Sequence, residues 1–238
     1  MTSRRAEILK EMGLSPVWRL RVAPGTPEPQ ALTVPEEDRQ AAILRMEWPT
    51  LKVTVAQCVD CPLHATRRQT VFGVGDGNAD WLFVGDGPGA DEDAQGEPFV
   101  GQAGKLLDNM LAAIRLKRGD NVYIANVVKC RPPGNRNPLP QEAHTCEPYL
   151  KRQIELIRPR LIVALGRVAA QNLLGREASI SSVRGRVLDY LGIPLIVTYH
   201  PAYLLRTLTD KAKAWEDLCF AVQTMKRLET VQPTINAS

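Results

Sequence analysis

From Trp81 onward, four short apolar runs alternate with longer amphipathic stretches, and this alternation constrains the fold more than any other sequence feature. The runs are rich in β-branched residues, as buried strands are, and they span Trp81–Gly85, Val122–Val128, Leu161–Leu165 and Pro194–Tyr199. Apolar residues recur with helical spacing in Ala103–Ile114, Tyr149–Ile157, Arg167–Leu174 and Lys211–Lys226. The sequence therefore predicts an α/β fold in which four parallel strands form one sheet with helices on both faces.

The first fifty residues differ from this pattern and predict an extension of the main domain. Helical stretches are expected from Arg4 to Met12 and from Pro35 to about Met46. The connector from Pro24 to Pro35 is rich in proline, which removes backbone donors and blocks the preceding helical turn. Because 238 residues suffice for one well-buried domain and a modest extension, we expect residues 1–50 to be an appendage of a domain spanning 51–238.

The amino-acid composition says more about the protein's location in the cell than about its function. Thirty Lys and Arg against 26 Asp and Glu give a net charge of +4, which permits attraction to phosphate without requiring it. No stretch approaches the roughly 18 uninterrupted apolar residues that span a bilayer, and the N-terminus leads into a charged segment rather than an apolar signal core. We therefore expect a monomeric, cytoplasmic protein with no membrane partner.

The cysteines predict a metal or cluster site. Cys58 and Cys61 form a Cys-x-x-Cys pair, Cys130 and Cys146 form a second pair, and Cys219 is most simply a buried small residue. An odd count with one close pair argues against a disulfide scaffold. Four thiolates can hold a [4Fe–4S] cluster or a tetrahedral zinc ion, and the spacing does not choose between them. A redox dithiol or two buried small residues would explain a lone pair equally well.

Unusual residues follow three of the four predicted strands. Gly85-Asp86-Gly87-Pro88-Gly89 follows the first strand, Asn126 lies near the end of the second, and His200 follows the fourth. Ligand sites in open α/β sheets lie at the carboxyl ends of the strands. We therefore expect one pocket to collect all three groups.

The glycine-rich loop superficially matches a dinucleotide-binding fingerprint. The residues from Asp91 to Phe99 are acidic and interrupted by Gly and Pro, so we expect no phosphate-cradling helix to begin directly at the loop. A tight turn whose glycines let the backbone approach a small flat ligand is the better interpretation. Phe99 is then a candidate stacking platform, although burial statistics for a single Phe favour a core role.

Three long motifs resemble those of the family 4 uracil-DNA glycosylases. They are Gly85-Asp86-Gly87-Pro88-Gly89-Ala90-Asp91-Glu92-Asp93 with Gly96-Glu97-Pro98-Phe99-Val100-Gly101, then Asn126-Val127-Val128-Lys129-Cys130-Arg131-Pro132-Pro133-Gly134-Asn135-Arg136, and His200-Pro201-Ala202-Tyr203-Leu204-Leu205. The likeness covers about Val53 to Arg227. It implies a three-layer α/β/α sandwich around a four-stranded parallel sheet. It also implies excision of uracil from DNA to leave an abasic site, which begins base excision repair.

The resemblance further implies roles for single residues. Phe99 would stack on the flipped uracil, and Asn126 would read its N3 donor and O4 acceptor, which cytosine does not offer in that arrangement. His200 would stabilise the negative charge that develops on uracil O2. Taken alone, Asn126 would as readily be a turn residue, and His200 would more often be structural. The [4Fe–4S] ligands in this family correspond to Cys58, Cys61, Cys130 and Cys146.

The sequence departs from the family pattern at the first motif. Asp86 stands where the family usually has Glu, and Gly87 stands where better-known uracil glycosylases carry an Asp that positions water. Asp86 and Glu92 are therefore the candidates for positioning the attacking water. Asp86 and Gly87 are also expected to contact the uracil.

A base inside a duplex cannot be reached, so such an enzyme must flip the nucleotide out of the stack. Leu204 and Leu205 are apolar groups that could wedge into the gap, although the same leucines would equally well begin a core helix. Basic side chains expected to contact phosphates are Lys129, Arg131, Arg136, Arg184, Arg186 and Arg206.

Two other functions compete with the glycosylase. A non-catalytic iron–sulfur or zinc protein could bind nucleic acid as an adaptor, and it would show DNA affinity without uracil release. A cluster-based electron carrier would leave the Asn126 and His200 motifs unexplained. Under the glycosylase interpretation, the N-terminal extension is a candidate docking arm for a replication or repair protein.

Overall fold

The computed structural model describes residues 7–8, 10–13 and 36–231. The chain divides into two compact units, residues 1–36 and 37–238. In the first unit, residues 7–8 and 10–11 are helical, inside the helix predicted from Arg4 to Met12. The proline-rich connector predicted from Pro24 to Pro35 lies outside the described residues.

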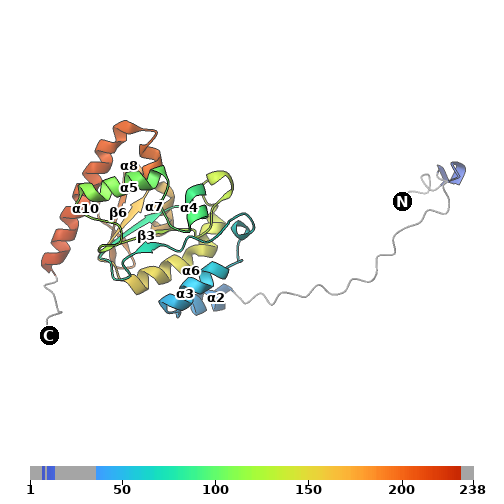
Figure 1. Cartoon of the computed structure of the whole chain (residues 1–238), viewed down its shortest axis with the longest axis horizontal. Helices are drawn as coiled ribbons and strands as arrows, with labels where there is room; N and C mark the ends of the chain where they lie inside the picture. The colour runs from blue at the N-terminus through green and yellow to red at the C-terminus, as the bar shows by residue number, and fades with distance from the viewer. Residues whose placement is uncertain (1–6, 9, 14–35, 232–238) are drawn as a thin grey trace. The chain divides into compact units, whose positions relative to one another are not determined.

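Six strands form one mixed sheet in the order β1-β3-β2-β4-β6-β5. Figure 1 shows the sheet, with β3 and β6 labelled, between the helices. They are β1 Val74–Gly75, β2 Trp81–Gly85, β3 Val122–Asn126, β4 Leu161–Leu165, β5 Leu188–Tyr190 and β6 Ile193–Thr198. The four central strands are mutually parallel, and they are the four predicted ones. The prediction of a purely parallel four-stranded sheet was wrong, because β1 and β5 pair antiparallel at the two edges.

The edge strands escaped prediction because they are short and carry no periodic pattern. β2, β3 and β4 are buried at every residue and therefore read as continuous apolar runs. β1 has 2 residues and β5 has 3, and both are only partly buried. Segments of this length are too short for alternation of polar and apolar residues to be recognised.

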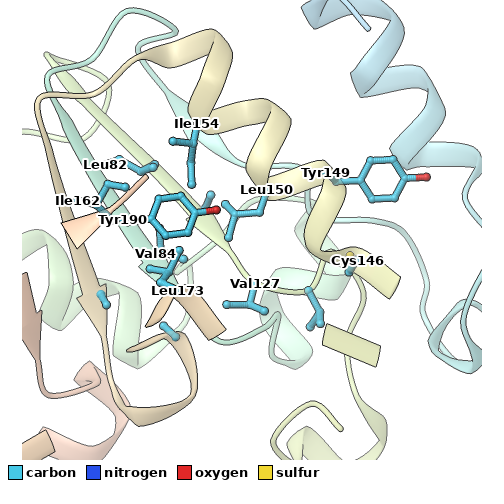
Figure 2. Close-up of a cluster of buried hydrophobic side chains, with 14 of the residues drawn as sticks. Leu82, Val84, Val127, Cys146, Tyr149, Leu150, Ile154, Ile162, Leu173 and Tyr190 are labelled. Carbon is cyan, nitrogen blue, oxygen red and sulfur yellow. The ribbon is translucent and has the colours of Figure 1, made fainter. Parts of the chain in front are cut away.

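Helices cover both faces of the sheet. They are α2 Glu36–Ile43, α3 Trp48–Gln57, α4 Ala90–Gln95, α5 Gln102–Ala113, α6 Pro140–Ile157, α7 Arg167–Leu174, α8 Ile180–Val183, α9 Pro201–Leu204 and α10 Lys211–Val231. Buried residues of α2, α3, α6 and α7 pack on the face that presents Leu82 and Ile162 (Figure 2). Buried residues of α5 and α10 pack on the face that presents Phe83 and Val163. Since neighbouring strand residues point to opposite faces, both helix layers bury strand side chains.

Helix α6 begins at Pro140, well before the predicted start at Tyr149. Proline is unfavourable inside a helix, because it lacks the N–H that an interior helical position donates. The helix nevertheless runs through Pro148. Its start is favoured by Pro140 in the first turn and by Glu142, whose carboxylate accepts a hydrogen bond from Leu139 N–H at 2.8 Å.

Helix α4 begins directly after the glycine-rich loop, so the prediction that no helix starts there was wrong. Its first turn contains Asp91, Glu92 and Asp93, and negative charge at a helix N-terminus is stabilising. Glu92 also accepts a hydrogen bond from the N–H of Gly89, the N-cap residue, at 3.0 Å. The acidic run therefore promotes the helix and occupies the place that a phosphate would take.

The second unit begins at Glu37, upstream of the domain boundary predicted at residue 50. Ile43 of α2 and Leu51 and Val55 of α3 are buried in the core on the α6 side of the sheet. Burial of these side chains joins the helix expected in the extension to the sheet domain. None of the helices in the described ranges is both long and apolar enough to cross a membrane.

Candidate active site

A cavity of about 770 Å³ lies at the carboxyl ends of the central strands. Its walls come from the loop after β2, the end of β3, the turn after β4 and the segment after β6. The structure thus brings together the three groups that the sequence placed at strand ends. All five predicted uracil-contacting residues line this cavity: Asp86, Gly87, Phe99, Asn126 and His200.

Asn126 is the last residue of β3, and its side chain is buried beside Phe99. The residue is 2% exposed, and its Oδ1 has no hydrogen-bond partner within the described residues. Gly85 makes room for both side chains, because a Cβ there would lie 2.5 Å from Asn126 Oδ1 and 2.6 Å from Phe99 Cζ. A buried acceptor left unpaired costs roughly 1–3 kcal/mol. Asn126 Oδ1 is therefore an acceptor available to an N–H of a ligand.

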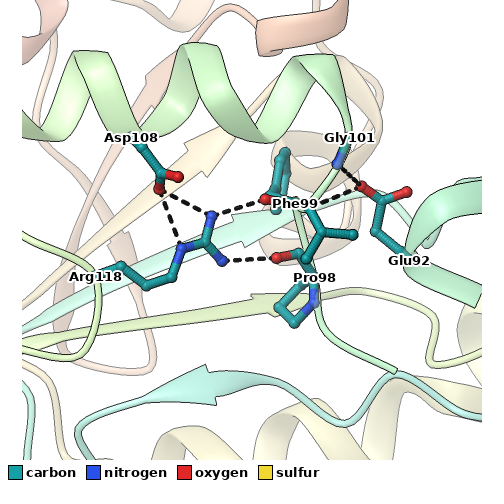
Figure 3. A network of polar contacts seen from close by, with 7 residues as sticks. Glu92, Pro98, Phe99, Gly101, Asp108 and Arg118 are labelled. Carbon is teal, nitrogen blue, oxygen red and sulfur yellow. Dashed lines mark hydrogen bonds and ion pairs between the residues drawn. The ribbon is translucent and has the colours of Figure 1, made fainter. Parts of the chain in front are cut away.

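Phe99 combines the two roles that the sequence left open. It is packed in the core beneath α5 and also lines the cavity. Its φ of +56° is uncommon for a residue with a side chain, so the turn needs support. Arg118 supplies it by donating to the carbonyls of Pro98 and Phe99 at 2.7 and 2.8 Å (Figure 3). Asp108 holds the same guanidinium at 2.9 and 3.1 Å.

Glu92 supports the same loop from the other side. One carboxylate oxygen accepts hydrogen bonds from Val100 and Gly101 N–H at 3.0 and 3.1 Å, and the other accepts from Gly89 N–H. Backbone donors thus occupy both oxygens. These contacts let Glu92 hold the Phe99 loop in place, and the catalytic role expected for Glu92 stays a prediction.

For the uracil release that the resemblance of the three motifs predicts, we expect Arg118→Met to lower kcat/KM about 10-fold, because hydrogen bonds to charged groups contribute roughly 1.5–3 kcal/mol. Methionine keeps most of the apolar stem of the side chain but frees the carbonyls of Pro98 and Phe99. Asp108→Asn is the matched control, since an amide oxygen still accepts from Arg118, and it should change kcat/KM only slightly. Steady-state kinetics on a uracil-containing oligonucleotide measure both. An unchanged kcat/KM in Arg118→Met would show that Phe99 needs no such support.

His200 caps the N-terminus of α9, and its two ring nitrogens have different partners. Nδ1 accepts a hydrogen bond from Ala202 N–H at 3.1 Å, so the neutral imidazole carries its proton on Nε2. Nε2 lies 3.4 Å from Asp86 Oδ1. The His200 and Phe99 rings are 5.5 Å apart between centroids. His200 therefore presents an N–H donor to the cavity next to the aromatic ring.

Asp86 is ionised at neutral pH. Burial raises its pKa, but the hydrogen bond and charge of His200 and the N–H of Gly87 at 2.9 Å outweigh burial, so the pKa lies below its usual value. The carboxylate form is present above this lowered pKa and is lost as the pH falls through it. Asp86 therefore carries a negative charge across the neutral range.

The four predicted ligand cysteines lie near one another on the α6 side of the sheet. Cys58 and Cys61 follow α3, Cys130 follows β3, and Cys146 lies on α6. Two sulfurs receive hydrogen bonds, from Arg67 Nη1 to Cys130 at 3.0 Å and from Lys129 N–H to Cys146 at 3.3 Å. In the part of the chain that the structure describes, no three His, Cys, Asp or Glu side chains form a group that could hold one metal ion.

Burial makes the thiols of Cys61, Cys130 and Cys146 harder to ionise, because it raises their pKa values above the usual range. The pKa of Cys130 is raised to about 11 and that of Cys146 to about 12, chiefly by burial and to a smaller extent by the neighbouring thiols. Cys58 Sγ lies 3.1 Å from Asp60 Oδ2, as expected for a thiol that donates. Metal binding would have to displace these protons, since thiolates are the ligating form.

Comparison with known proteins decides the family. The model of the Uracil DNA glycosylase superfamily matches residues 72–219. The chain is 52% identical to the type-4 uracil-DNA glycosylase of Archaeoglobus fulgidus, over 63% of this chain and 79% of that protein. It is 47% identical to the Thermotoga maritima enzyme of the same description, over 67% and 83%, and 42% identical to that of Pyrobaculum aerophilum, over 73% and 92%. The chain belongs to the type-4 uracil-DNA glycosylases. The family suggested by the three motifs is therefore confirmed.

Several residues expected to touch DNA have structural roles in this type-4 glycosylase. Lys129 is 1% exposed, and its Nζ donates to Asn126 O at 2.9 Å and to Gln153 Oε1 at 2.6 Å. Leu204 is also 1% exposed, so the core interpretation holds for it in this structure. Arg184 pairs with the carboxylates of α10 at 2.9 and 3.1 Å. Burial, which depends on tertiary contacts, withdraws Lys129 and Leu204 from the surface, and the phosphate contact of Arg184 stays a prediction.

The other expected DNA contacts of the type-4 glycosylase lie at the surface. Leu205 is 41% exposed and remains the candidate wedge. Arg206 is exposed and lines the cavity, while Arg186 is exposed near α8. Arg136 also lines the cavity but is paired with Glu142 at 2.6 Å. Arg131, which is half-buried, donates to Asn135 Oδ1 at 2.7 Å.

Sequence reasoning missed residues that support the site from outside the motifs. Gly166, after β4, has φ +92°, and a Cβ there would lie 2.8 Å from His200 Cβ. Its place at a strand end was a signal that could have been used. Arg118 and Asp108 had no such signal, because their bonds to the Phe99 turn exist only in the folded chain.

Proposed function

We propose that this chain removes uracil from DNA by hydrolysing its N-glycosidic bond, which leaves an abasic site and begins base excision repair. The relatives described as type-4 uracil-DNA glycosylases support this reaction. The observation that carries it is the buried Asn126 Oδ1, which has no partner within the described residues and lies beside the Phe99 ring in the cavity.

Uracil fits the groups that surround this acceptor. Its N3–H can donate to Asn126 Oδ1, and its O4 can accept from Asn126 Nδ2. Cytosine carries an acceptor at N3 and an amino donor at position 4, so both contacts would be mismatched. Each misdirected buried hydrogen bond costs roughly 1–3 kcal/mol, which is enough to select uracil. The Phe99 ring, one side of the cavity, supplies the flat apolar surface for the base.

The bond between C1′ of the sugar and N1 of uracil breaks with its electron pair going to uracil. Negative charge then spreads onto uracil O2, while the sugar gains oxocarbenium character. The Nε2–H of His200 is a fixed donor in the cavity and can bind O2 as the charge develops. A neutral imidazole suffices for this role, because Nδ1 is already occupied by Ala202 N–H.

Water completes the reaction by adding to C1′. Its oxygen forms the new bond to the sugar, and its proton passes to the carboxylate of Asp86, which is ionised at neutral pH. The proton is then available to the departing uracil anion. Asp86 fills this role better than Glu92, whose oxygens accept three backbone hydrogen bonds.

Release of free uracil from a uracil-containing oligonucleotide tests the function, and Asn126→Ala tests the base recognition. We expect the variant to lower kcat/KM about 10- to 100-fold, since two hydrogen bonds of roughly 1 kcal/mol or more are lost. Asn137→Ala is the control, because this exposed residue lines the cavity without a side-chain hydrogen bond among the described residues. No uracil release by the wild-type protein would contradict the function, and equal losses in both variants would contradict the role of Asn126.

We also propose that the four grouped cysteines hold a [4Fe–4S] cluster. The chemistry of the donor set fits, because all four cysteines belong to segments that pack on the same side of the sheet and two of the sulfurs accept hydrogen bonds from N–H donors, as cluster sulfurs do. Arg39 Nη2, next to Asp60, is buried without a partner among the described residues and offers a further donor. When bound, the cluster would cross-link α3, the segment after β3 and α6. The ligands would be Cys58, Cys61, Cys130 and Cys146.

A non-catalytic nucleic-acid adaptor remains the competing function, and it requires DNA binding without uracil release. An adaptor function does not explain why Asn126 Oδ1 is buried with no hydrogen-bond partner among the described residues. The monomeric state, the cytoplasmic location and a partner for residues 1–50 stay predictions. Light scattering during gel filtration measures the oligomeric state. Comparing the protein with and without residues 1–36, in the presence of a candidate partner, shows whether these residues bind that partner.

A further inference from the structure

The cavity contains a second group of residues that the reaction at the base does not use. Tyr199, Tyr203, Arg167 and Arg206 all line it. Its volume of about 770 Å³ lies in the range of pockets that hold ligands of several rings, and one pyrimidine fills only part of it. The remaining space and these side chains can accept more of the substrate than the flipped base.

Tyr199 and Tyr203 form a fixed aromatic surface. Their rings are 5.4 Å apart between centroids and nearly parallel, at 14°. The Tyr203 hydroxyl donates to Asp210 Oδ2 at 2.7 Å, and Lys213 holds Asp210 at 2.8 Å. The guanidinium of Arg184 lies 5.9 Å over the Tyr199 ring. The orientation of both rings is therefore set before any ligand binds.

Two cations accompany this surface. Arg167 begins α7 and Arg206 follows α9, and both are exposed. No ion pair or side-chain hydrogen bond joins either guanidinium to another residue in the described ranges. Aromatic rings with adjacent arginines are the combination that binds unpaired nucleotides, because the base stacks on the ring and the phosphate pairs with the cation.

We propose that Tyr199 and Tyr203, with Arg167 and Arg206, form a stacking subsite for the nucleotide next to the uracil in single-stranded DNA. The subsite rests on the proposed function, because it extends the same cavity. A neighbouring base in a duplex is already stacked on both faces, whereas an unpaired base has a free face to offer. The subsite therefore favours uracil in single strands over uracil in duplexes.

Tyr203→Ala tests the subsite on two single-stranded oligonucleotides. One carries ordinary bases on both sides of the uracil, and the other carries base-free tetrahydrofuran residues there. Since stacking of one base contributes about 10-fold or more in affinity, Tyr203→Ala should raise KM about 10-fold on the first oligonucleotide. It should leave KM unchanged on the second, where no flanking base exists.

Two variants control for indirect effects. Tyr203→Phe keeps the ring and removes the bond to Asp210, so we expect KM close to wild type on both oligonucleotides. Trp215→Ala removes an exposed aromatic residue of α10 that does not line this cavity, and it should change neither KM. Equal increases in KM on both oligonucleotides in Tyr203→Ala would show a structural role and overturn the subsite.

A binding measurement separates failure of the subsite from failure of the proposed function. A fluorescent 2-aminopurine beside the uracil should lose fluorescence when it stacks on the wild-type protein. The loss should be absent with Tyr203→Ala and present with Tyr203→Phe. Absence of uracil release would count against the glycosylase, whereas unquenched 2-aminopurine on either side of the uracil in a bound complex would overturn the subsite alone.

Discussion

Replacement of His200 by alanine is expected to lower kcat for uracil release about 10²- to 10³-fold, the usual cost of removing one preorganised donor from an oxyanion site. The donor is the Nε2–H, whose proton is fixed because Nδ1 accepts from Ala202 N–H. KM should change little, because the charge on uracil O2 develops only as the bond breaks. Single-turnover release of uracil from an oligonucleotide measures the chemical step directly.

Three comparisons make this result specific. His144→Ala, at an exposed position of α6, should keep the wild-type rate. Loss of the His200 cap costs about 1 kcal/mol of stability, so thermal melting should show that the variant remains folded at the assay temperature. A folded His200→Ala protein that releases uracil within a few-fold of wild type would require another group to stabilise O2.

From the proposed cluster ligation, we expect Cys146→Ala to prevent cluster binding and to destabilise the domain strongly. The broad absorption near about 400 nm and the bound iron should both be lost, because the ligand on α6 is missing. Metal or cluster binding acts as folding energy, and a loss of about 5 kcal/mol would lower Tm by roughly 10–20 °C in a domain of this size. Iron analysis, absorption spectra and thermal melting of anaerobically purified protein give three independent measurements.

Cys219→Ala is the matched control for this experiment. Cys219 lies on α10, which packs on the opposite face of the sheet from the four grouped cysteines, so iron content and spectrum should be unchanged. Wild-type protein treated with a chelator provides a second reference. Cys146→Ala should melt close to this metal-free form, since the packing lost with one sulfur is small. Retention of four irons by Cys146→Ala would contradict the proposed ligand set.

The central strands could be predicted because their burial leaves a continuous apolar run in the sequence of each strand. β2 and β4 are buried along their whole length, so their sequences contain only apolar residues and glycine. The edge strands β1 and β5 form because a neighbouring strand offers free backbone groups, and two or three residues do not encode that pairing. The same limit applies to α6, where capping by Glu142 outweighs the interior Pro148.

The site was predictable where one residue type is needed at a strand end. Asp86, Asn126 and His200 were identified because parallel strands bring their carboxyl ends together. Glu92 belonged to the same motif, but its three backbone partners could not be read from it. Arg184 was expected to contact phosphate, and the sequence did not reveal that the fold pairs it with carboxylates of α10.

The sequence by itself determined the positions of the four central strands, the family and the residues expected to contact uracil, which line the cavity. These depend on apolar periodicity and on side-chain types that the chemistry demands. Tertiary structure alone decided which charged residues are free and which are structural. Arg118 became a support for Phe99, and Lys129 a buried donor to Asn126 O, because partners distant in the chain or hidden in the core satisfy their charges. The residue type of a charged side chain does not show whether that side chain is exposed or is buried against a partner. Its role therefore depends on burial and on neighbouring groups, which only the folded structure provides.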